Sequence, residues 1–214
     1  MKNLIFVHVP KCAGTSVTIG LKSVYGKHLF VDRSWRRYRG KSQRWQWHSR
    51  LPFDDSEIVF PKPDVRCVAG HFTHVKYSFL GWPKFVFLRE PYARVVSHYS
   101  VRGHRAVVSF EDFVRSGENS ISRMVGDLRQ YFFVGLQEHY EESMKMLEWY
   151  AGIKILNIHR NFRRVPVYEP TEGEGSLYRK LNGQDFDLYK EAKKIFNRQR
   201  SEYGAKKTNH KESS

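Results

Sequence analysis

The stretch that decides the fold is the apolar run Leu4-Ile5-Phe6-Val7-His8-Val9, followed at once by Pro10-Lys11-Cys12-Ala13-Gly14-Thr15-Ser16. The first run is short and rich in β-branched and aromatic residues, as is typical of a buried parallel strand. A helical pattern follows the second run, because Val17, Leu21 and Val24 recur at three- and four-residue steps. The sequence therefore predicts a strand, a turn of small residues and a helix.

The turn between this strand and this helix has the composition of an anion site. A helix N-terminus presents unpaired N–H groups and the positive end of the helix dipole. Lys11 adds a positive charge, and Thr15 and Ser16 add hydroxyl donors. Ala13 and Gly14 leave room for a ligand close to the backbone. An ordinary turn before a capped helix is the alternative interpretation.

Length and composition indicate one basic domain. The chain has 214 residues and a formal net charge of +15 at pH 7, which favours acidic partners. We expect a single domain over residues 1–203, and a disordered basic tail over residues 204–214, where apolar residues are scarce. The two cysteines, Cys12 and Cys67, fit a reducing compartment. The first strand begins without a preceding signal or transmembrane segment, so we expect a cytoplasmic protein.

Two histidines follow the next predicted strand, Val65-Arg66-Cys67-Val68-Ala69. Ligands of open α/β sheets gather at the carboxyl ends of strands. His71 comes directly after this strand and Gly70, which is a suitable place for a catalytic base. His74 is a weaker candidate, for contact with a substrate. A lone histidine is more often structural or merely exposed, and that alternative stays open for both.

A second anion site is predicted after the strand Lys84-Phe85-Val86-Phe87-Leu88. Arg89 stands at the end of this strand, and Pro91 suits the first turn of the helix that follows. Ser97 lies on the first turns of that helix. We interpret this corner as having the same build as the first, so that together they bind a ligand with two anionic groups. A structural salt bridge between Arg89 and Glu90 is the alternative.

The remaining pattern alternates strands with helices. We expect further strands at 28–31, 131–135 and 153–158, and helices starting at Ser109 and covering 119–128 and 138–150, with a polar loop over 159–175 and a last helix capped by Asp185. This alternation predicts a three-layer α/β fold, with a mostly parallel sheet of about five strands flanked by helices.

Residues 33–50 contain no acidic side chain and alternate arginines with aromatic residues. Such side chains pair with anionic groups and stack on sugar rings. We take Arg36, Arg37, Trp45 and Trp47 as candidates for binding an acceptor. A solvated basic surface whose tryptophans enter the core is the equally open alternative.

Several of these segments resemble a known enzyme family. The run 10–16 resembles the 5′-phosphosulfate loop of sulfotransferases that use 3′-phosphoadenosine 5′-phosphosulfate (PAPS), and residues 87–99 resemble their 3′-phosphate segment. The likeness is strongest to the branch of heparan sulfate 2-O- and 6-O-sulfotransferases and their bacterial relatives, in which a histidine such as His8 precedes the loop. Gly70-His71-Phe72 resembles the segment that carries the catalytic base in the 2-O-sulfotransferases. The likeness runs from about Leu4 to Tyr189 and implies a P-loop-like fold.

The resemblance also implies roles for individual residues. Lys11 would bind the 5′-phosphosulfate, and His71 would take the proton of the acceptor hydroxyl. Arg89 and Ser97 would bind the 3′-phosphate. The rest of the implied nucleotide loop is Cys12, Ala13, Gly14, Thr15 and Ser16, with Cys12 standing where threonine is usual. No metal is expected to be required, because a sulfuryl group carries less negative charge than a phosphoryl group.

The resemblance implies transfer of a sulfuryl group from PAPS to an acceptor hydroxyl. The basic, aromatic residues 33–50 favour an anionic saccharide as the acceptor, and small alcohols, lipids, phenols and peptides are the alternatives. A P-loop kinase is one alternative, but the Walker A motif G-x-x-x-x-G-K-[ST] places its lysine directly before the hydroxyl residue. Here Lys11 comes four residues before Thr15. A nucleic-acid-binding module is the other alternative. It explains the charge but not two phosphate corners, and we expect no obligate nucleic-acid partner.

Overall fold

The computed structural model describes residues 1–32, 61–106, 108–156 and 167–212. In these residues the chain forms a five-stranded sheet in which every strand is parallel to its neighbours. The strand order is β2-β3-β1-β4-β5, and the strands are β1 (Leu4–Val7), β2 (Leu29–Asp32), β3 (Cys67–Gly70), β4 (Lys84–Leu88) and β5 (Tyr131–Leu136). The predicted parallel α/β sheet is therefore confirmed.

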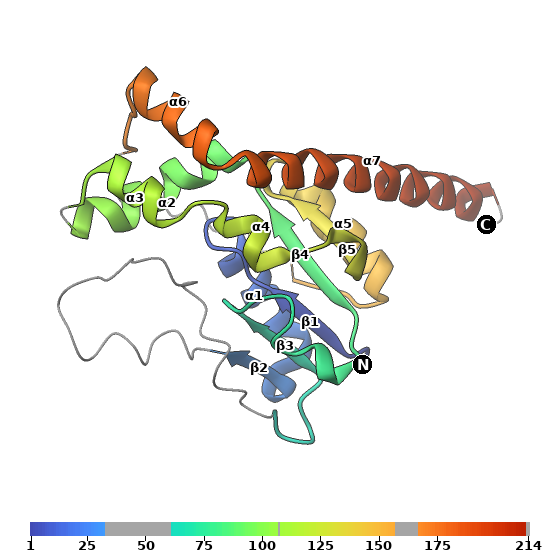
Figure 1. The fold of residues 1–214 in the computed structure, drawn as a ribbon. Coiled ribbons are helices and arrows are strands. Elements are labelled where there is room, and N and C mark those ends of the chain that lie inside the picture. The colour runs from blue at the N-terminus through green and yellow to red at the C-terminus, as the bar shows by residue number, and fades with distance from the viewer. Residues whose placement is uncertain (33–60, 107, 157–166, 213–214) are drawn as a thin grey trace.

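Helices flank the sheet, as the alternating pattern predicts. They are α1 (Gly14–Tyr25), α2 (Pro91–Ala106), α3 (Phe110–Ser116), α4 (Ser120–Val125), α5 (Tyr140–Ala151), α6 (Glu172–Leu181) and α7 (Gly183–Glu212). Helix α1 contacts β2 and β3, whereas α5 and α7 contact β5. In Figure 1 the long helix α7 runs past α4 and β5, and α2, α3 and α6 form a group near its N-terminal end.

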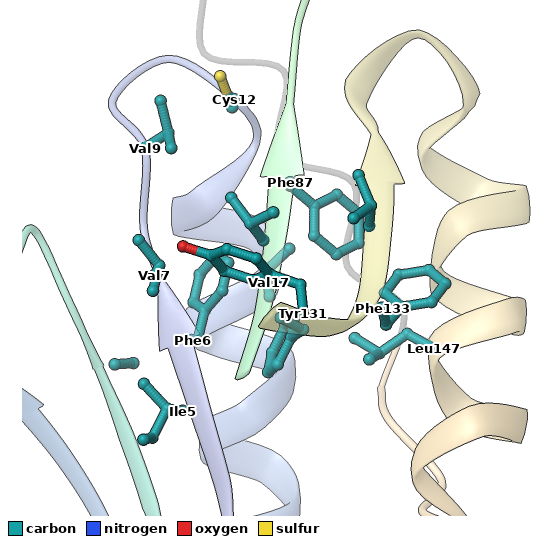
Figure 2. Packing of buried hydrophobic residues seen from close by; sticks show 14 of the residues in the cluster. Ile5, Phe6, Val7, Val9, Cys12, Val17, Phe87, Tyr131, Phe133 and Leu147 are labelled. Carbon is teal, nitrogen blue, oxygen red and sulfur yellow. The ribbon is translucent and has the colours of Figure 1, made fainter. Parts of the chain in front are cut away.

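Two apolar clusters support this arrangement. The main cluster surrounds the sheet, whose central strands are buried on both faces, as expected when helices cover a parallel sheet. Phe87 and Phe133 lie in it with ring centroids 6.1 Å apart, close to Leu147 of α5 (Figure 2). A smaller cluster joins α2, α3 and α6 through Val95, Tyr99, Phe110, Phe113, Val114 and Tyr178.

The strand expected at 153–158 is absent from its described part. Residues 153–156 pass beside the sheet without joining it. The N–H of Ile155 donates to Glu148 Oε1 at 2.6 Å, so a side chain of α5 takes the place of a strand partner. The side chain of Ile155 is buried against α1, where a Cβ on Gly20 would lie 2.6 Å from it.

Asp185 does not cap the last helix, contrary to the sequence-based expectation. Helix α7 begins at Gly183, and the carboxylate of Asp185 instead accepts hydrogen bonds from the N–H groups of Ile121 at 3.2 Å and Ser122 at 2.7 Å. These donors belong to the first turn of α4. Asp185 therefore caps a helix distant in sequence, and its burial is compensated by these two bonds.

The chain also contains more helix than expected near its C-terminus. The predicted polar loop 159–175 ends early, because Thr171 and Glu174 form a capping box that starts α6 at Glu172. Helix α7 continues to Glu212, through most of the segment expected as a disordered tail. Part of the reason is that the Lys206 ammonium lies 5.4 Å from the ring centroid of Trp149, which covers an exposed aromatic side chain.

The side chain of Gln199 on α7 hydrogen-bonds to the outer edge of the sheet. The N–H of Val134 donates to Gln199 Oε1 at 3.2 Å, and Gln199 Nε2 donates to the carbonyl of Phe132 at 3.0 Å. Gln199 is buried, so these bonds are protected from water. Its amide thus satisfies two backbone groups of β5 that face away from β4.

Candidate active site

Three adjacent strands bring the principal candidate residues to one edge of the sheet. Val7 of β1 is paired with Gly70 of β3 on one side and with Val86 of β4 on the other. His71 follows β3 and Arg89 follows β4, while the loop that contains Lys11 follows β1. Neighbouring strands lie about 4.8 Å apart, so the three ends span a width suited to one small molecule. The order along this edge is His71, the Lys11 loop, Arg89.

The loop between β1 and α1 has an unusual backbone. Lys11 and Ala13 adopt positive φ angles of 68° and 59°, and the intervening residue does not. Left-handed backbone costs roughly 1–2 kcal/mol for a residue with a Cβ, so the surrounding fold must impose it. Such alternation turns successive N–H groups toward one point and makes a concave anion site.

Helix α1 leaves its N-terminal N–H groups available to a ligand. It begins at Gly14 without an acidic residue in its first turn, and no described side chain caps its N-terminus. The helix dipole is therefore not neutralised there by a nearby carboxylate. Thr15 is exposed at this end, whereas Ser16 is buried and its hydroxyl is hydrogen-bonded to the Tyr140 hydroxyl of α5.

Cys12 lies in the same loop (Figure 2), but its thiol is buried within the protein. The thiol approaches the carbonyl of Pro10 at 3.8 Å and accepts a hydrogen bond from the backbone N–H of Arg89. Burial raises the pKa of Cys12 to about 12, against the opposing effect of the charges on Arg94 and Arg89. Cys12 therefore stays protonated and joins the first loop to the end of β4.

The corner between β4 and α2 is built differently from the first, contrary to our expectation. Glu90 Oε2 accepts the N–H of Ala93 at 2.6 Å, and Glu138 Oε1 accepts the N–H of Glu90 at 2.7 Å. These carboxylates already satisfy the N-terminus of α2 and oppose its dipole. Arg89 and Ser97 are both half-buried beside it, so their side chains are the groups available to an anion.

His71 has a defined orientation at the end of β3. Its Nδ1 lies 2.6 Å from the carbonyl oxygen of His8, and a carbonyl can only accept, so Nδ1 carries the proton. In the neutral imidazole the basic lone pair is then on Nε2. This arrangement suits a base that removes a proton from a substrate hydroxyl.

His74, expected to contact the acceptor, is held by the protein itself. Its N–H donates to the carbonyl of Met124 at 2.8 Å, and its own carbonyl accepts from Lys84 Nζ at 2.8 Å. Its ring packs on Gly126, where a Cβ would lie 2.5 Å from Cε1. The structure thus gives His74 a role in holding the segment after His71.

A buried ion pair, missed in the sequence, fixes the same segment to the edge of the sheet. Lys76 Nζ lies 3.0 Å from Asp32 Oδ2 at the end of β2, and the Tyr77 hydroxyl donates to the same oxygen at 2.9 Å. The side chains of Lys76 and Asp32 are only 0% and 2% exposed. Breaking one partner of such a pair is costly, so the chain after His71 is held firmly.

The predicted acceptor contacts Arg36, Arg37, Trp45 and Trp47 lie outside the described residues. Within the described ranges, no group of three or more His, Cys, Asp or Glu side chains is arranged to hold a metal ion. No helix in that part of the chain is long and apolar enough to cross a bilayer.

A comparison with models of protein families identifies the family of the chain. A model described as the sulfotransferase family matches residues 1–169, which is most of the chain and includes all three strand ends. The chain belongs to the sulfotransferase family. No curated protein matches this sulfotransferase significantly. The family match does not identify a branch, so the likeness to the heparan sulfate 2-O- and 6-O-sulfotransferases stays a prediction.

Proposed function

We propose that this sulfotransferase transfers a sulfuryl group from PAPS to a hydroxyl of an anionic saccharide, with His71 as the base. The observation that carries the proposal is the order of His71, the Lys11 loop and Arg89 along three adjacent strand ends. An acceptor, a 5′-phosphosulfate and a 3′-phosphate would have to follow one another in the same order.

The two anionic groups of PAPS match the two corners, each of which offers positively charged or N–H groups. The backbone of the loop from Lys11 to Ser16 and the uncapped N-terminus of α1 would hold the 5′-phosphosulfate. Arg89 and Ser97 would hold the 3′-phosphate one strand further along. Arginine suits that position because its planar group donates two parallel hydrogen bonds to a phosphate.

The reaction would be a single in-line displacement at sulfur. The acceptor oxygen forms a bond to sulfur while the bond from sulfur to the bridging oxygen breaks, and that electron pair stays on the 5′-phosphate of the released 3′-phosphoadenosine 5′-phosphate (PAP). His71 Nε2 takes the acceptor proton. Lys11 and the N–H groups of α1 stabilise the charge that develops on the bridging oxygen. His71 and Arg89 follow the strands on either side of β1, so the base and the 3′-phosphate site would flank the loop that holds the sulfuryl group.

The acceptor and the cellular location are proposed from composition. The net charge of +15 favours an anionic saccharide. Both cysteines are free and buried thiols, which fits our expectation of a cytoplasmic protein.

Calorimetry and a transfer assay test the proposal. We expect PAP to bind with a Kd of about 1–10 μM, more tightly than ATP and without magnesium. A screen of sulfated and unsulfated oligosaccharides with labelled PAPS should then yield a labelled product. Preference for ATP with magnesium would point to a kinase. Preference for an oligonucleotide, with an affinity that falls steeply between two salt concentrations, would point to nucleic-acid binding.

A further inference from the structure

A column of aromatic rings connects the hydrophobic core to the proposed base. Phe85 and Phe6 stack with ring centroids 4.8 Å apart, and Phe6 stacks on His8 at 5.4 Å. The ring of His8 in turn lies 4.1 Å from that of His71. Phe6 and His8 share a side of the chain because residues two apart in an extended segment point the same way. His71 is therefore the last member of a packed series that starts on fully buried phenylalanines.

The main chain of His8 holds β3 and His71 at the same time. Its N–H donates to the carbonyl of Gly70 at 2.9 Å, which extends the ladder between β1 and β3. Its carbonyl accepts from His71 Nδ1 at 2.6 Å and so selects the tautomer with the lone pair on Nε2. One residue thus sets both the position of the strand end and the orientation of the imidazole.

The ring of His8 also touches the phosphosulfate loop. A Cβ placed on Gly14, the first residue of α1, would lie 1.9 Å from both Cδ2 and Nε2 of His8. Any side chain at Gly14 would therefore displace this ring, and His71 lies within contact of the same ring. The imidazole of His8 fills the space between the start of α1 and the base.

His8 itself is unsuited to take a proton. Burial, followed by the charge that His71 carries when protonated, holds the pKa of His8 well below its ordinary value. The ring is thus neutral near pH 7 and serves as a flat, rigid spacer rather than as a second cation beside the base.

We infer that His8 is a positioning residue, whose ring sets the separation between the phosphosulfate loop and His71 and keeps the base aimed at the sulfuryl group. This inference rests on the proposed function and adds a residue to it. In this role His8 acts by positioning His71 and the start of α1, and not on the reacting atoms themselves.

Paired substitutions test the inference. His8→Ala removes the ring and should lower kcat by about 10- to 100-fold, because a misplacement of about 1 Å costs rates of this order. Its affinity for PAP should stay within about threefold, because the α1 N–H groups and Arg89 are retained. His8→Phe restores a planar ring and should recover most of the lost kcat. Gly14→Ala should reduce kcat as His8→Ala does, because it displaces the same ring.

A second readout does not depend on activity. Nitrogen-15 NMR of the histidine rings, assigned with His71→Ala, should show the Nδ1–H tautomer of His71 in the parent protein and in His8→Phe. It should show mixed tautomers in His8→Ala, because the imidazole of His71 then loses the ring that packs beside it and holds it against the main-chain carbonyl of residue 8. Unaltered kcat and tautomer in a folded His8→Ala would overturn the inference. A His8→Phe variant as impaired as His8→Ala would also overturn it, by showing that the imidazole acts chemically. A parent protein without transfer from PAPS, but with the expected tautomer pattern, would refute the proposed function while the spacer role of His8 stands.

Discussion

The two strand-to-helix corners look alike in sequence and differ in charge. In the β1–α1 corner, positive φ angles at Lys11 and Ala13 precede a helix with no acidic residue in its first turn. In the β4–α2 corner, Glu90 and Glu138 already occupy the N–H groups at the helix start. We therefore expect the first corner to bind an anion with its backbone, and the second to bind one with the side chains of Arg89 and its neighbours.

This difference matches the demands of the proposed reaction. Charge develops on the 5′ side as the bridging bond breaks, and fixed N–H dipoles stabilise it without reorganising. The charge of the 3′-phosphate does not change during transfer, so a simple ion pair is sufficient there. Substitutions in the first corner should lower kcat, and substitutions in the second should lower the affinity for PAP.

Lys11→Ala should produce the largest effect. Loss of its positive charge beside the leaving oxygen should lower kcat by about 10²- to 10³-fold, as is found when one group that stabilises a developing charge is removed. Steady-state kinetics with PAPS measures this. Lys22→Ala, an exposed lysine in the last turn of the same helix, is the matched control and should be nearly silent. A Lys11→Ala variant that lost only PAP affinity would make the two corners equivalent.

Arg89→Ala should weaken binding more than turnover. A hydrogen bond to a charged group contributes about 1.5–3 kcal/mol, so we expect PAP affinity to fall by about 10- to 100-fold. Adenosine 5′-phosphosulfate, which lacks the 3′-phosphate, should bind equally well to the parent protein and the variant. Arg115→Ala, an exposed arginine paired with Glu111 on α3, is the control. Equal losses for both nucleotides would remove the 3′-phosphate role of Arg89.

Glu90→Ala should affect stability rather than ligand binding. Removing its carboxylate leaves the N–H of Ala93 without its cap and should lower the free energy of unfolding by about 0.5–2 kcal/mol. Urea denaturation measures this, and calorimetry should show PAP affinity retained or slightly improved. A loss of PAP binding as large as that of Arg89→Ala would show that the capped turn itself takes part in binding.

The same small substitution should have opposite signs in the two corners. Ala13→Gly relieves a left-handed residue and should raise the free energy of unfolding by up to about 1 kcal/mol. Ala93→Gly, in the first turn of α2, should lower it by about 0.5–1 kcal/mol, because glycine loses more conformational entropy in a helix. Urea denaturation of the two variants and the parent protein under the same conditions measures both changes in the free energy of unfolding. If both variants lowered the free energy of unfolding, the positive φ at Ala13 would carry no strain.

The strands and the first loop could be predicted because their signals are local. The apolar runs at β1 and β4 and the small residues before Gly14 are readable within a few positions. The capping of α2 by Glu138 could not be read this way, because the donor at Glu90 is 48 residues away in sequence. Without that contact the two corners look alike, and the sequence-based interpretation gave them the same build.

Side-chain direction limited the prediction of the site in the same way. Cys12 and Ser16 occupy loop positions that suit a ligand, but packing against β4 and α5 turns the Cys12 thiol and the Ser16 hydroxyl toward the protein. Asp185 is of a residue type that often caps the helix it begins, but here it caps α4, where its partner Ser122 is 63 residues away in sequence. The start of α6 was readable, since Thr171 followed by Glu174 is a capping-box signature.

The contact of Gln199 with β5 has a consequence for the solubility of the molecule. Its side-chain amide stands where the backbone of a further strand would pair with Phe132 and Val134. An uncovered strand edge is a template for pairing with another chain. A protein shortened before Gln199 would expose that template, and we expect it to self-associate through β5 even if its nucleotide loop still forms.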